Sequence, residues 1–233
     1  MRKLKFTKNY LPHAEGSCLI EMGETKVLCV ASIEEKVPSF VEQKNKAAGK
    51  TSGWLTAEYA MMPRSGNERS QRVKLITGGR SQEISRLIGR ALRACVDFEK
   101  LGNRTITIDC DVIRADGGTR CAAINGAFVA LSLAVKTLLK QKLISQNPIK
   151  FCVGAVSVGV YKGKPIVDLC ALEDNNADVD MNIVANDKGN LIEVQGTAEG
   201  NTFSRSELNF LLDSALKAVK KINSAQKSAL GTK

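Results

Sequence analysis

The chain has 233 residues, of which 43% are hydrophobic, and its formal net charge is +10 with a sequence pI of about 9.3. This composition excludes a disordered tail and allows a sizeable core, and the seven cysteines, which form no C-x-x-C pair, argue against a disulfide framework or a zinc site. No apolar run is long enough to cross a bilayer and no secretory signal follows the basic N-terminus, so we expect a cytoplasmic location and no membrane partner.

The N-terminal part of the chain is expected to contain strands and polar loops. Alternating apolar residues predict a hairpin with strands near 16–21 and 26–33 around Gly23 and Glu24. A polar, lysine-containing loop is expected over 37–53, followed by a short strand over 54–62. The segment 63–79 is rich in arginine and lacks apolar periodicity, so we expect a loop there.

The middle of the chain alternates between helix and strand. Gly78 and Gly79 open the first helix, and a strand over 104–113 is followed by a second helix from Thr119 to about Lys142. Apolar residues recur at helical spacing in the first helix and predict one buried stripe, formed by Ile84, Leu87, Ile88, Ala91, Leu92 and Cys95.

The C-terminal part contains four strand-like runs, over 151–160, 165–174, 180–185 and 191–200. The last helix begins at Ser204, and Glu207 completes a capping box. Strands grouped before helices, without strict β-α-β alternation, indicate an α+β fold. The chain has no linker-like segment, so we expect one domain over residues 1–233.

The charge is unevenly distributed along the sequence. Basic residues dominate between Arg64 and Arg93, where only Glu68 and Glu83 oppose them, and carboxylates dominate between 168 and 199. The first segment is suited to anions and the second to cations or protons. On the first helix we expect Glu83 to pair with Arg86. A solvated face or a subunit interface is the alternative for Arg90 and Arg93.

Two helix starts combine a Gly-Gly pair with an arginine. These are Gly78–Arg80 and Gly117–Arg120. A helix N-terminus offers free N–H groups and partial positive charge, and arginine adds a fork that fits phosphate oxygens. An ordinary turn and cap would explain either start alone, but the repetition favours a phosphate site. Neither start matches a nucleotide P-loop, and the single histidine, His13, makes a histidine base improbable.

Two aspartates are candidates for a metal site. Asp174 ends one predicted strand and Asp180 begins the next, so their side chains are expected at the same rim. Oxygen ligands of this kind suit Mg²⁺ or Mn²⁺. The alternative is that both are ordinary solvated loop residues.

Long ordered blocks of the sequence resemble those of the bacterial ribonuclease PH family. They run from about Thr7 to nearly the C-terminus, and they read "NYLPHAEGS", "GETKVLCVAS", "GWLTAEYAMMPR", "GGRSQEISRLIGRALRACVD", "ITIDCDVIRADGGTR", "GAVSVGV", "EDNNADVDMN" and "IEVQGTAEG". The resemblance implies a ribosomal-protein-S5-like (domain 2) α+β fold with mixed sheets and helices packed against them. It also implies a hexameric ring assembled as a trimer of dimers.

The same resemblance implies a phosphate-dependent 3′→5′ exoribonuclease, or tRNA nucleotidyltransferase. Such an enzyme trims tRNA precursors and other structured RNA 3′ ends and releases nucleoside diphosphates. Inorganic phosphate would be the co-substrate, and Mg²⁺ or Mn²⁺ the metal.

The resemblance also assigns the site residues. It places phosphate on Arg80, Gly118, Thr119 and Arg120, and the metal on Asp174 and Asp180, with Asp180 favoured as the general acid. The catalytic residues would then be Arg80, Arg120 and Asp180, and the predicted RNA contacts are Arg64, Arg69, Arg72 and Arg86.

Two other functions remain open from the sequence. One is a non-catalytic RNA-binding ring subunit, in which the basic loops would keep their use while the site residues would decay. The other is a hydrolytic nuclease, in which the carboxylates would activate water. The predicted site residues have not decayed, which argues against the ring subunit, and the two arginine-bearing helix starts count against the hydrolytic nuclease. Trp54 and Tyr59 lie in an apolar strand, so we expect them in the core rather than stacked on bases.

Overall fold

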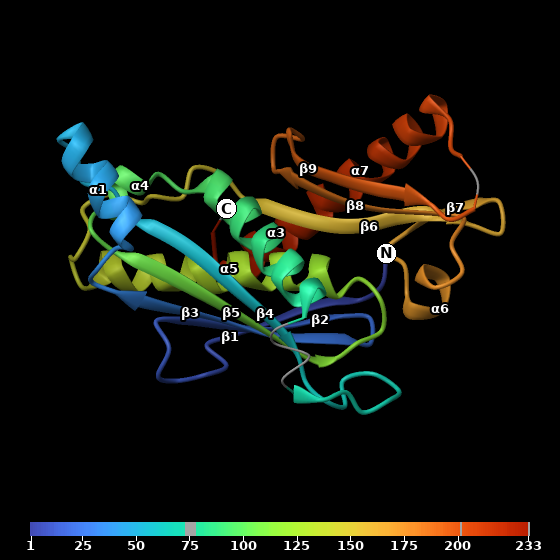
Figure 1. Cartoon of the computed structure of the whole chain (residues 1–233), viewed down its shortest axis with the longest axis horizontal. Coiled ribbons are helices and arrows are strands. Elements are labelled where there is room, and N and C mark those ends of the chain that lie inside the picture. Colours follow the sequence, from blue (N-terminus) through green and yellow to red (C-terminus); the bar gives the residue numbers. More distant parts are fainter. Residues whose placement is uncertain (73–77, 201, 233) are drawn as a thin grey trace.

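The computed structural model describes residues 1–72, 78–200 and 202–232, and these form two β-sheets with helices packed against them. Figure 1 shows one sheet above the other with α3 and α5 between them. The strand order is β1-β2-β3-β5-β4 in the first sheet and β7-β6-β8-β9 in the second. This arrangement confirms the predicted α+β class.

The first sheet contains the predicted hairpin and extends it on both sides. Each of its neighbouring strand pairs is antiparallel except β4 with β5, which is parallel. The edge strand β1 was not predicted, because its short run of alternating lysines has little apolar signal. The strands are β1 (Leu4–Lys8), β2 (Gly16–Met22), β3 (Thr25–Glu34), β4 (Trp54–Met61) and β5 (Thr105–Arg114).

Three long helices supply most of the helical core. In α3 (Gly79–Cys95) the six predicted stripe residues are all buried. The helix α5 (Thr119–Lys140) packs on β2, β3 and β6, and α7 (Arg205–Leu230) packs mainly on β6. The predicted capping box at Ser204 is present, because the Ser204 hydroxyl accepts from the Glu207 N–H at 3.2 Å.

The helix α5 differs from the expectation that no segment could cross a bilayer. By length and composition it is apolar enough to do so, but 72% of its most apolar window is buried inside the protein. A helix that is apolar on nearly all sides is what a core position between two sheets requires.

The second sheet consists of β6 (Val153–Tyr161), β7 (Lys164–Val167), β8 (Val179–Asn186) and β9 (Leu191–Ala198). The strand β7 pairs with β6 only from Val158 to Tyr161. Along the rest of that edge, side chains replace a partner strand. Asn125 of α5 bonds to both the N–H and the carbonyl of Ala155, at 2.7 and 2.8 Å, and Gln226 of α7 donates to the Val153 carbonyl at 3.0 Å. These bonds attach both helices to the second sheet.

Two predictions of secondary structure were wrong. Segment 37–53 contains the helix α1 (Ser39–Ala48), of which only Val41 is buried, so it carries no apolar stripe to recognise. The predicted strand over 165–174 ends at Val167, because Asp168 adopts a left-handed backbone with φ 67° and the chain then forms α6 (Ala171–Asp174). A second short helix, α4 (Phe98–Leu101), precedes β5.

Candidate functional site

A pocket of about 230 Å³ at the N-terminus of α5 contains every residue predicted to hold phosphate or metal. They come from four elements, α3, α5, α6 and β8, which the fold brings together. The roles of these residues remain predictions, and the proximity is an observation. The predicted residues that line the pocket are Arg80, Gly118, Thr119, Arg120, Asp174 and Asp180.

The glycine pair of this site is required by its backbone. Gly117 and Gly118 both have left-handed φ values, 72° and 62°. A Cβ atom on Gly117 would also lie 2.5 Å from the carbonyl carbon of Cys170. This distance is a steric clash, so the Cys170 backbone would have to move. Gly118 caps α5, and the first N–H groups of a helix have no partner within it. The pair therefore allows a sharp turn that presents a helix N-terminus to the pocket.

Two side chains fix this turn from the first sheet. The Thr25 hydroxyl donates to the Gly117 carbonyl at 2.7 Å and accepts from the Asp116 N–H at 2.9 Å. The Tyr59 hydroxyl donates to Thr119 Oγ1 at 2.9 Å. Burial raises the pKa of Tyr59, so the phenol stays a neutral donor. Tyr59 is buried, as predicted, whereas Trp54 is half-buried, and no pattern in the sequence indicated that Tyr59 contacts the site.

The two arginines differ in how firmly they are held. Arg80 is exposed in the first turn of α3. Arg120 is half-buried, with Nη1 3.5 Å from Glu83 Oε1 and 3.4 Å from Gln195 Oε1. Both contacts are long, so the guanidinium keeps capacity to bind an anion. Within the described part of the chain Glu83 pairs with Arg120 and not with Arg86, so that sequence prediction was wrong.

Asp180 and Asp174 face the same pocket from β8 and the end of α6. Burial raises the pKa of Asp180 to about 6; the nearby Asp174 carboxylate adds to the shift, and Arg120 opposes it. Asp180 Oδ1 is buried, and among residues 1–72, 78–200 and 202–232 it has no hydrogen-bond partner. A buried carboxylate oxygen without a donor in the protein is satisfied by a proton, a cation or a water molecule. Asp174 lies on a short helix and not at a strand end, but the predicted meeting of the two carboxylates is observed.

Sequence reasoning missed three polar residues that also line the pocket: Asn175, directly after α6, and two strand residues. Ser157 of β6 accepts from the Leu169 N–H at 3.1 Å. Asn182 of β8 accepts from the Cys121 thiol at 3.2 Å. Each of the two strand residues is a single polar residue within an apolar strand run, and that interruption was the available signal.

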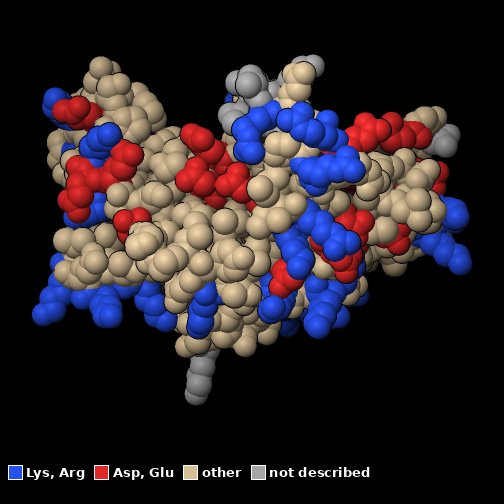
Figure 2. All heavy atoms as spheres, turned by 90° about the horizontal axis from the view of Figure 1, so that it is seen from below, with Lys and Arg blue, Asp and Glu red and all other residues tan. Residues whose placement is uncertain are grey.

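The predicted RNA-binding arginines lie outside this pocket. Arg64 lines a neighbouring hollow with Lys26, Arg114, Glu24 and Asp116. Arg114 Nη1 lies 2.7 Å from Glu24 Oε2, and this hollow shares Ala115 with the pocket. Arg69 and Arg72 are exposed in the segment before α3, and Lys74 of the same basic segment lies outside the described residues. Figure 2, which views the molecule from below, shows Lys and Arg gathered beside small acidic groups on this face.

Arg86 also lies outside the pocket. It lines a separate hollow with the carboxylates Glu58, Asp109 and Asp111. Burial raises the pKa of Asp109, with the charges of Glu58 and Asp111 adding to the shift. Arg86 therefore faces an acidic surface, which offers RNA less than the surroundings of Arg64 do.

Arg90 and Arg93 have partners within the chain. Arg90 Nη2 lies 2.5 Å from Glu193 Oε1 of β9, and the Arg93 guanidinium lies 4.9 Å from the centre of the Trp54 ring. These contacts explain how α3 tolerates arginines at i and i+3 on one face. They also connect α3 to both sheets.

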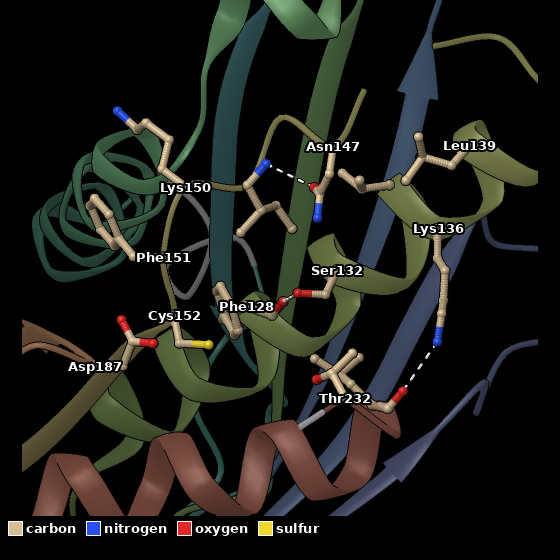
Figure 3. A pocket seen from close by; sticks show the side chains of 13 residues that line it. Phe128, Ser132, Lys136, Leu139, Asn147, Lys150, Phe151, Cys152, Asp187 and Thr232 are labelled. Atoms are coloured by element: carbon tan, nitrogen blue, oxygen red, sulfur yellow. Dashed lines mark hydrogen bonds between the residues drawn. The ribbon is translucent and has the colours of Figure 1, made fainter. Parts of the chain in front are cut away.

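A second cavity, of about 270 Å³, lies further along α5 (Figure 3). Phe128, Ser132 and Lys136 of α5 line it together with segment 149–152 and the end of α7. Its lining is mainly apolar and includes none of the residues predicted for phosphate, metal or RNA.

Family comparisons match most of the chain. A model of the 3′ exoribonuclease family (RNase PH), domain 1, matches residues 1–136. A model of domain 2 of the same family matches residues 152–218. The pocket residues fall in both matched segments: Arg80 and Gly118–Arg120 in the first, Asp174 and Asp180 in the second.

Solved structures with the same fold include subunits of exosomes. Rrp46 from rice (Oryza sativa) has a TM-score of 0.78 at 20% identity, over 100% of this chain and 96% of that chain. An archaeal exosome core has a TM-score of 0.74 at 20% identity, covering 97% and 87%. An Archaeoglobus fulgidus exosome with RNA bound to its active site has a TM-score of 0.72 at 20% identity, covering 96% and 87%. At this identity the likeness concerns the fold.

Proposed function

We propose, because the chain belongs to the 3′ exoribonuclease family, that it is an active phosphate-dependent 3′→5′ exoribonuclease of the bacterial ribonuclease PH type. It would trim tRNA precursors and other structured RNA 3′ ends and release nucleoside diphosphates. One observation carries the proposal: two arginines, a glycine-opened helix N-terminus and two carboxylates line a single pocket.

The proposed reaction uses phosphate itself as the nucleophile. An oxygen of inorganic phosphate attacks the phosphorus of the terminal phosphodiester, the bond to the 3′ oxygen breaks, and that oxygen takes a proton. The terminal nucleotide leaves as a nucleoside diphosphate. Because phosphate supplies the attacking oxygen, no serine, cysteine or histidine nucleophile is needed.

The electrostatic task of this reaction is to hold two anions together. Two unit charges about 4 Å apart repel by roughly 4 kcal/mol at an effective dielectric near 20. Arg80, Arg120 and the N–H groups at the start of α5 would offset this repulsion and stabilise the more crowded transition state. The long contacts of Arg120 leave it able to turn toward such an anion.

The carboxylates would supply the remaining chemistry. Asp174 and Asp180 fit a divalent cation, because Asp180 Oδ1 is buried and lacks a donor in the described ranges, and the nearby Asp174 charge makes ionisation of Asp180 costly unless a cation offsets it. Mg²⁺ or Mn²⁺ held there would neutralise charge on the scissile phosphate. The described residues provide no group of three or more His, Cys, Asp or Glu ligands, so phosphate oxygens and water would complete the shell. Alternatively the raised pKa lets Asp180 carry the proton that the 3′ oxygen takes.

RNA would reach the pocket over a basic surface. Arg64, Lys26 and Arg114 line the adjoining hollow, and Arg69 and Arg72 lie in the same exposed segment. Contacts of this kind bind phosphates without reading sequence, so RNA affinity should fall steeply as salt rises. The exosome subunits of the same fold support assembly into a ring, which we propose is a homohexamer.

A non-catalytic RNA-binding ring subunit is the second candidate. The likeness to exosome subunits at 20% identity is compatible with it. The intact set of pocket residues favours catalysis, since a subunit that only binds RNA has no need of two arginines facing two carboxylates.

The deciding experiment incubates the purified protein with Mg²⁺ and a tRNA bearing extra 3′ nucleotides, with and without inorganic phosphate. We expect nucleoside diphosphates only when phosphate is present. Monophosphates released without phosphate would indicate hydrolysis. RNA binding without any released nucleotide, by protein shown to form a ring, would favour the non-catalytic subunit.

A further inference from the structure

Arg2, two residues before β1, reaches from the first sheet to the second. Its backbone N–H donates to Asp168 Oδ2 at 2.7 Å, and its Nη2 donates to Asp168 Oδ1 at 2.6 Å. The Asp168 side chain has no solvent exposure. Figure 1 shows the N-terminus beside α6 and the end of β7, where Asp168 lies. Both carboxylate oxygens are thus satisfied by one residue from the other end of the sequence.

The same guanidinium holds the turn that opens α5. Its Nη1 donates to the Asp116 carbonyl and lies 3.7 Å from the Asp116 carboxylate. Its Nη2 lies 3.1 Å from the position that a Cβ on Gly118 would occupy. Arg2 therefore contacts the backbone immediately before the glycine pair and lies close to Gly118.

Asp168 belongs to the linker that leads to the carboxylate side of the pocket. The linker continues through Leu169 and Cys170 into α6, which ends at Asp174. Its backbone lies against Gly117, and the Ala171 N–H donates to Asp116 Oδ1 at 3.3 Å. One side of the Arg2 guanidinium thus holds the linker to Asp174, and the other side holds the turn to Gly118 and Arg120.

We propose that Arg2 is a positioning residue that sets the spacing between the phosphate-binding turn and α6, and so controls phosphate affinity. This inference rests on the proposed function of the pocket. Arg2 does not line the pocket, so it would act through Asp116 and Asp168. A planar fork is suited to this task because it donates along two directions at once, which an ammonium group at one point does not reproduce.

The test compares Arg2→Ala and Arg2→Lys with Lys3→Ala, in protein tagged at the C-terminus. Lys3 is the neighbouring exposed cation, so its variant matches the loss of charge near the N-terminus. The KM for phosphate, the KM for RNA, kcat and the thermal midpoint with and without phosphate are measured for each. Residues that orient binding groups change affinity by about 10- to 100-fold when removed.

We expect Arg2→Ala to raise the KM for phosphate about tenfold while the KM for RNA changes little. Arg2→Lys should fall between Arg2→Ala and the wild type, and Lys3→Ala should match the wild type. An unchanged phosphate KM in both Arg2 variants would overturn the inference. Equal increases in both KM values together with a lower thermal midpoint would also overturn it, because they indicate general loosening. If Arg2→Ala does not fold, Arg2→Lys decides alone.

Phosphate binding separates this inference from the proposed function. If the wild type releases no nucleotide but phosphate raises its thermal midpoint, the proposed activity fails and the inference is tested by that rise alone. A smaller rise in Arg2→Lys than in Lys3→Ala would support it, and equal rises would overturn it. If phosphate has no effect on the wild type, both are overturned.

Discussion

Two cavities of similar size lie along α5 and differ in chemistry. The first, of about 230 Å³, is at the N-terminus of the helix and is lined by arginines, carboxylates and the glycine turn. The second, of about 270 Å³, lies beside the middle and C-terminal half of the helix, around Phe128 and Leu139. The two cavities therefore do not differ in volume. They differ in their position along α5, because N–H groups without an intrahelical partner occur only in the first turn of a helix.

The state of the polar groups also separates the two cavities. In the second cavity Lys136 Nζ donates to the Leu230 carbonyl at 3.1 Å and the Ser132 hydroxyl donates to the Phe128 carbonyl at 2.8 Å, as Figure 3 shows. Asp187 Oδ1 there is buried without a partner in the described segments, but its Oδ2 lies 3.3 Å from Lys227. In the first cavity Asp180 Oδ1, which has no partner in the described segments, shares the pocket with a second carboxylate. The Lys136 and Asp187 side chains of the second cavity thus have partners within the protein, whereas the two carboxylates of the first cavity lie beside one another.

The largest expected effect is a loss of stability without a loss of phosphate binding, on truncation of Phe128 in the second cavity. Phe128→Ala should lower the free energy of unfolding by about 3–5 kcal/mol, because it removes a fully buried ring and leaves a void. The KM for phosphate should stay near that of the wild type. Urea unfolding and steady-state kinetics measure the two quantities. Phe210→Ala, at an exposed position outside both cavities, is the control, and a large rise in phosphate KM in Phe128→Ala would show that the cavities are coupled.

The reverse pattern is expected in the first cavity. Arg120→Ala should lower kcat for phosphate-dependent release about 10²- to 10³-fold, the usual effect of removing one charge-stabilising donor. Unfolding in urea should change by less than about 0.5 kcal/mol, since both contacts of Arg120 are long. Arg205→Ala, outside both cavities, should retain activity. Undiminished release by Arg120→Ala would remove the central claim about this pocket.

Gly117→Ala tests whether the turn itself defines the first cavity. Gly49 has a similar φ of 61° but open space around its Cβ position, so Gly49→Ala isolates the backbone cost, about 1 kcal/mol. Gly117→Ala adds a clash with the Cys170 backbone and should cost about 2–3 kcal/mol. Only Gly117→Ala should raise the KM for phosphate. Equal unfolding free energies for the two variants would contradict the close approach.

The smallest expected effect is a dependence of stability on pH. The pKa of Asp180 is about 6 in the folded protein, above its ordinary value, so folding favours the protonated form. Ionisation of Asp180 therefore lowers the free energy of unfolding of the wild type progressively as the pH rises from about 4 to about 6. Asp180→Asn should gain on the order of 1 kcal/mol over the wild type at pH 7, after allowing for partial exposure, and little at pH 4. Parallel pH profiles of the two proteins in urea unfolding would contradict the shift.

Much of the fold was predictable because the patterns involved are local. The apolar stripe of α3, the hairpin β2–β3 and the capping box at Ser204 each depend on residues within a few positions of one another. The two errors in secondary structure have local causes as well. The helix α1 buries only Val41 and so shows no periodicity, and the left-handed backbone at Asp168 interrupts an otherwise convincing strand pattern.

The sequence by itself determined which residue types would form the site. The glycine-arginine helix starts and the pair Asp174 and Asp180 are visible in the letters, and a helix N-terminus has the same chemistry wherever it lies. Only the tertiary structure decided how they are held. The bonds of Thr25 to Gly117, Tyr59 to Thr119 and Arg2 to Asp168 join residues 92, 60 and 166 positions apart. No periodicity or spacing encodes such pairs, because they exist only after the two sheets have packed around α5.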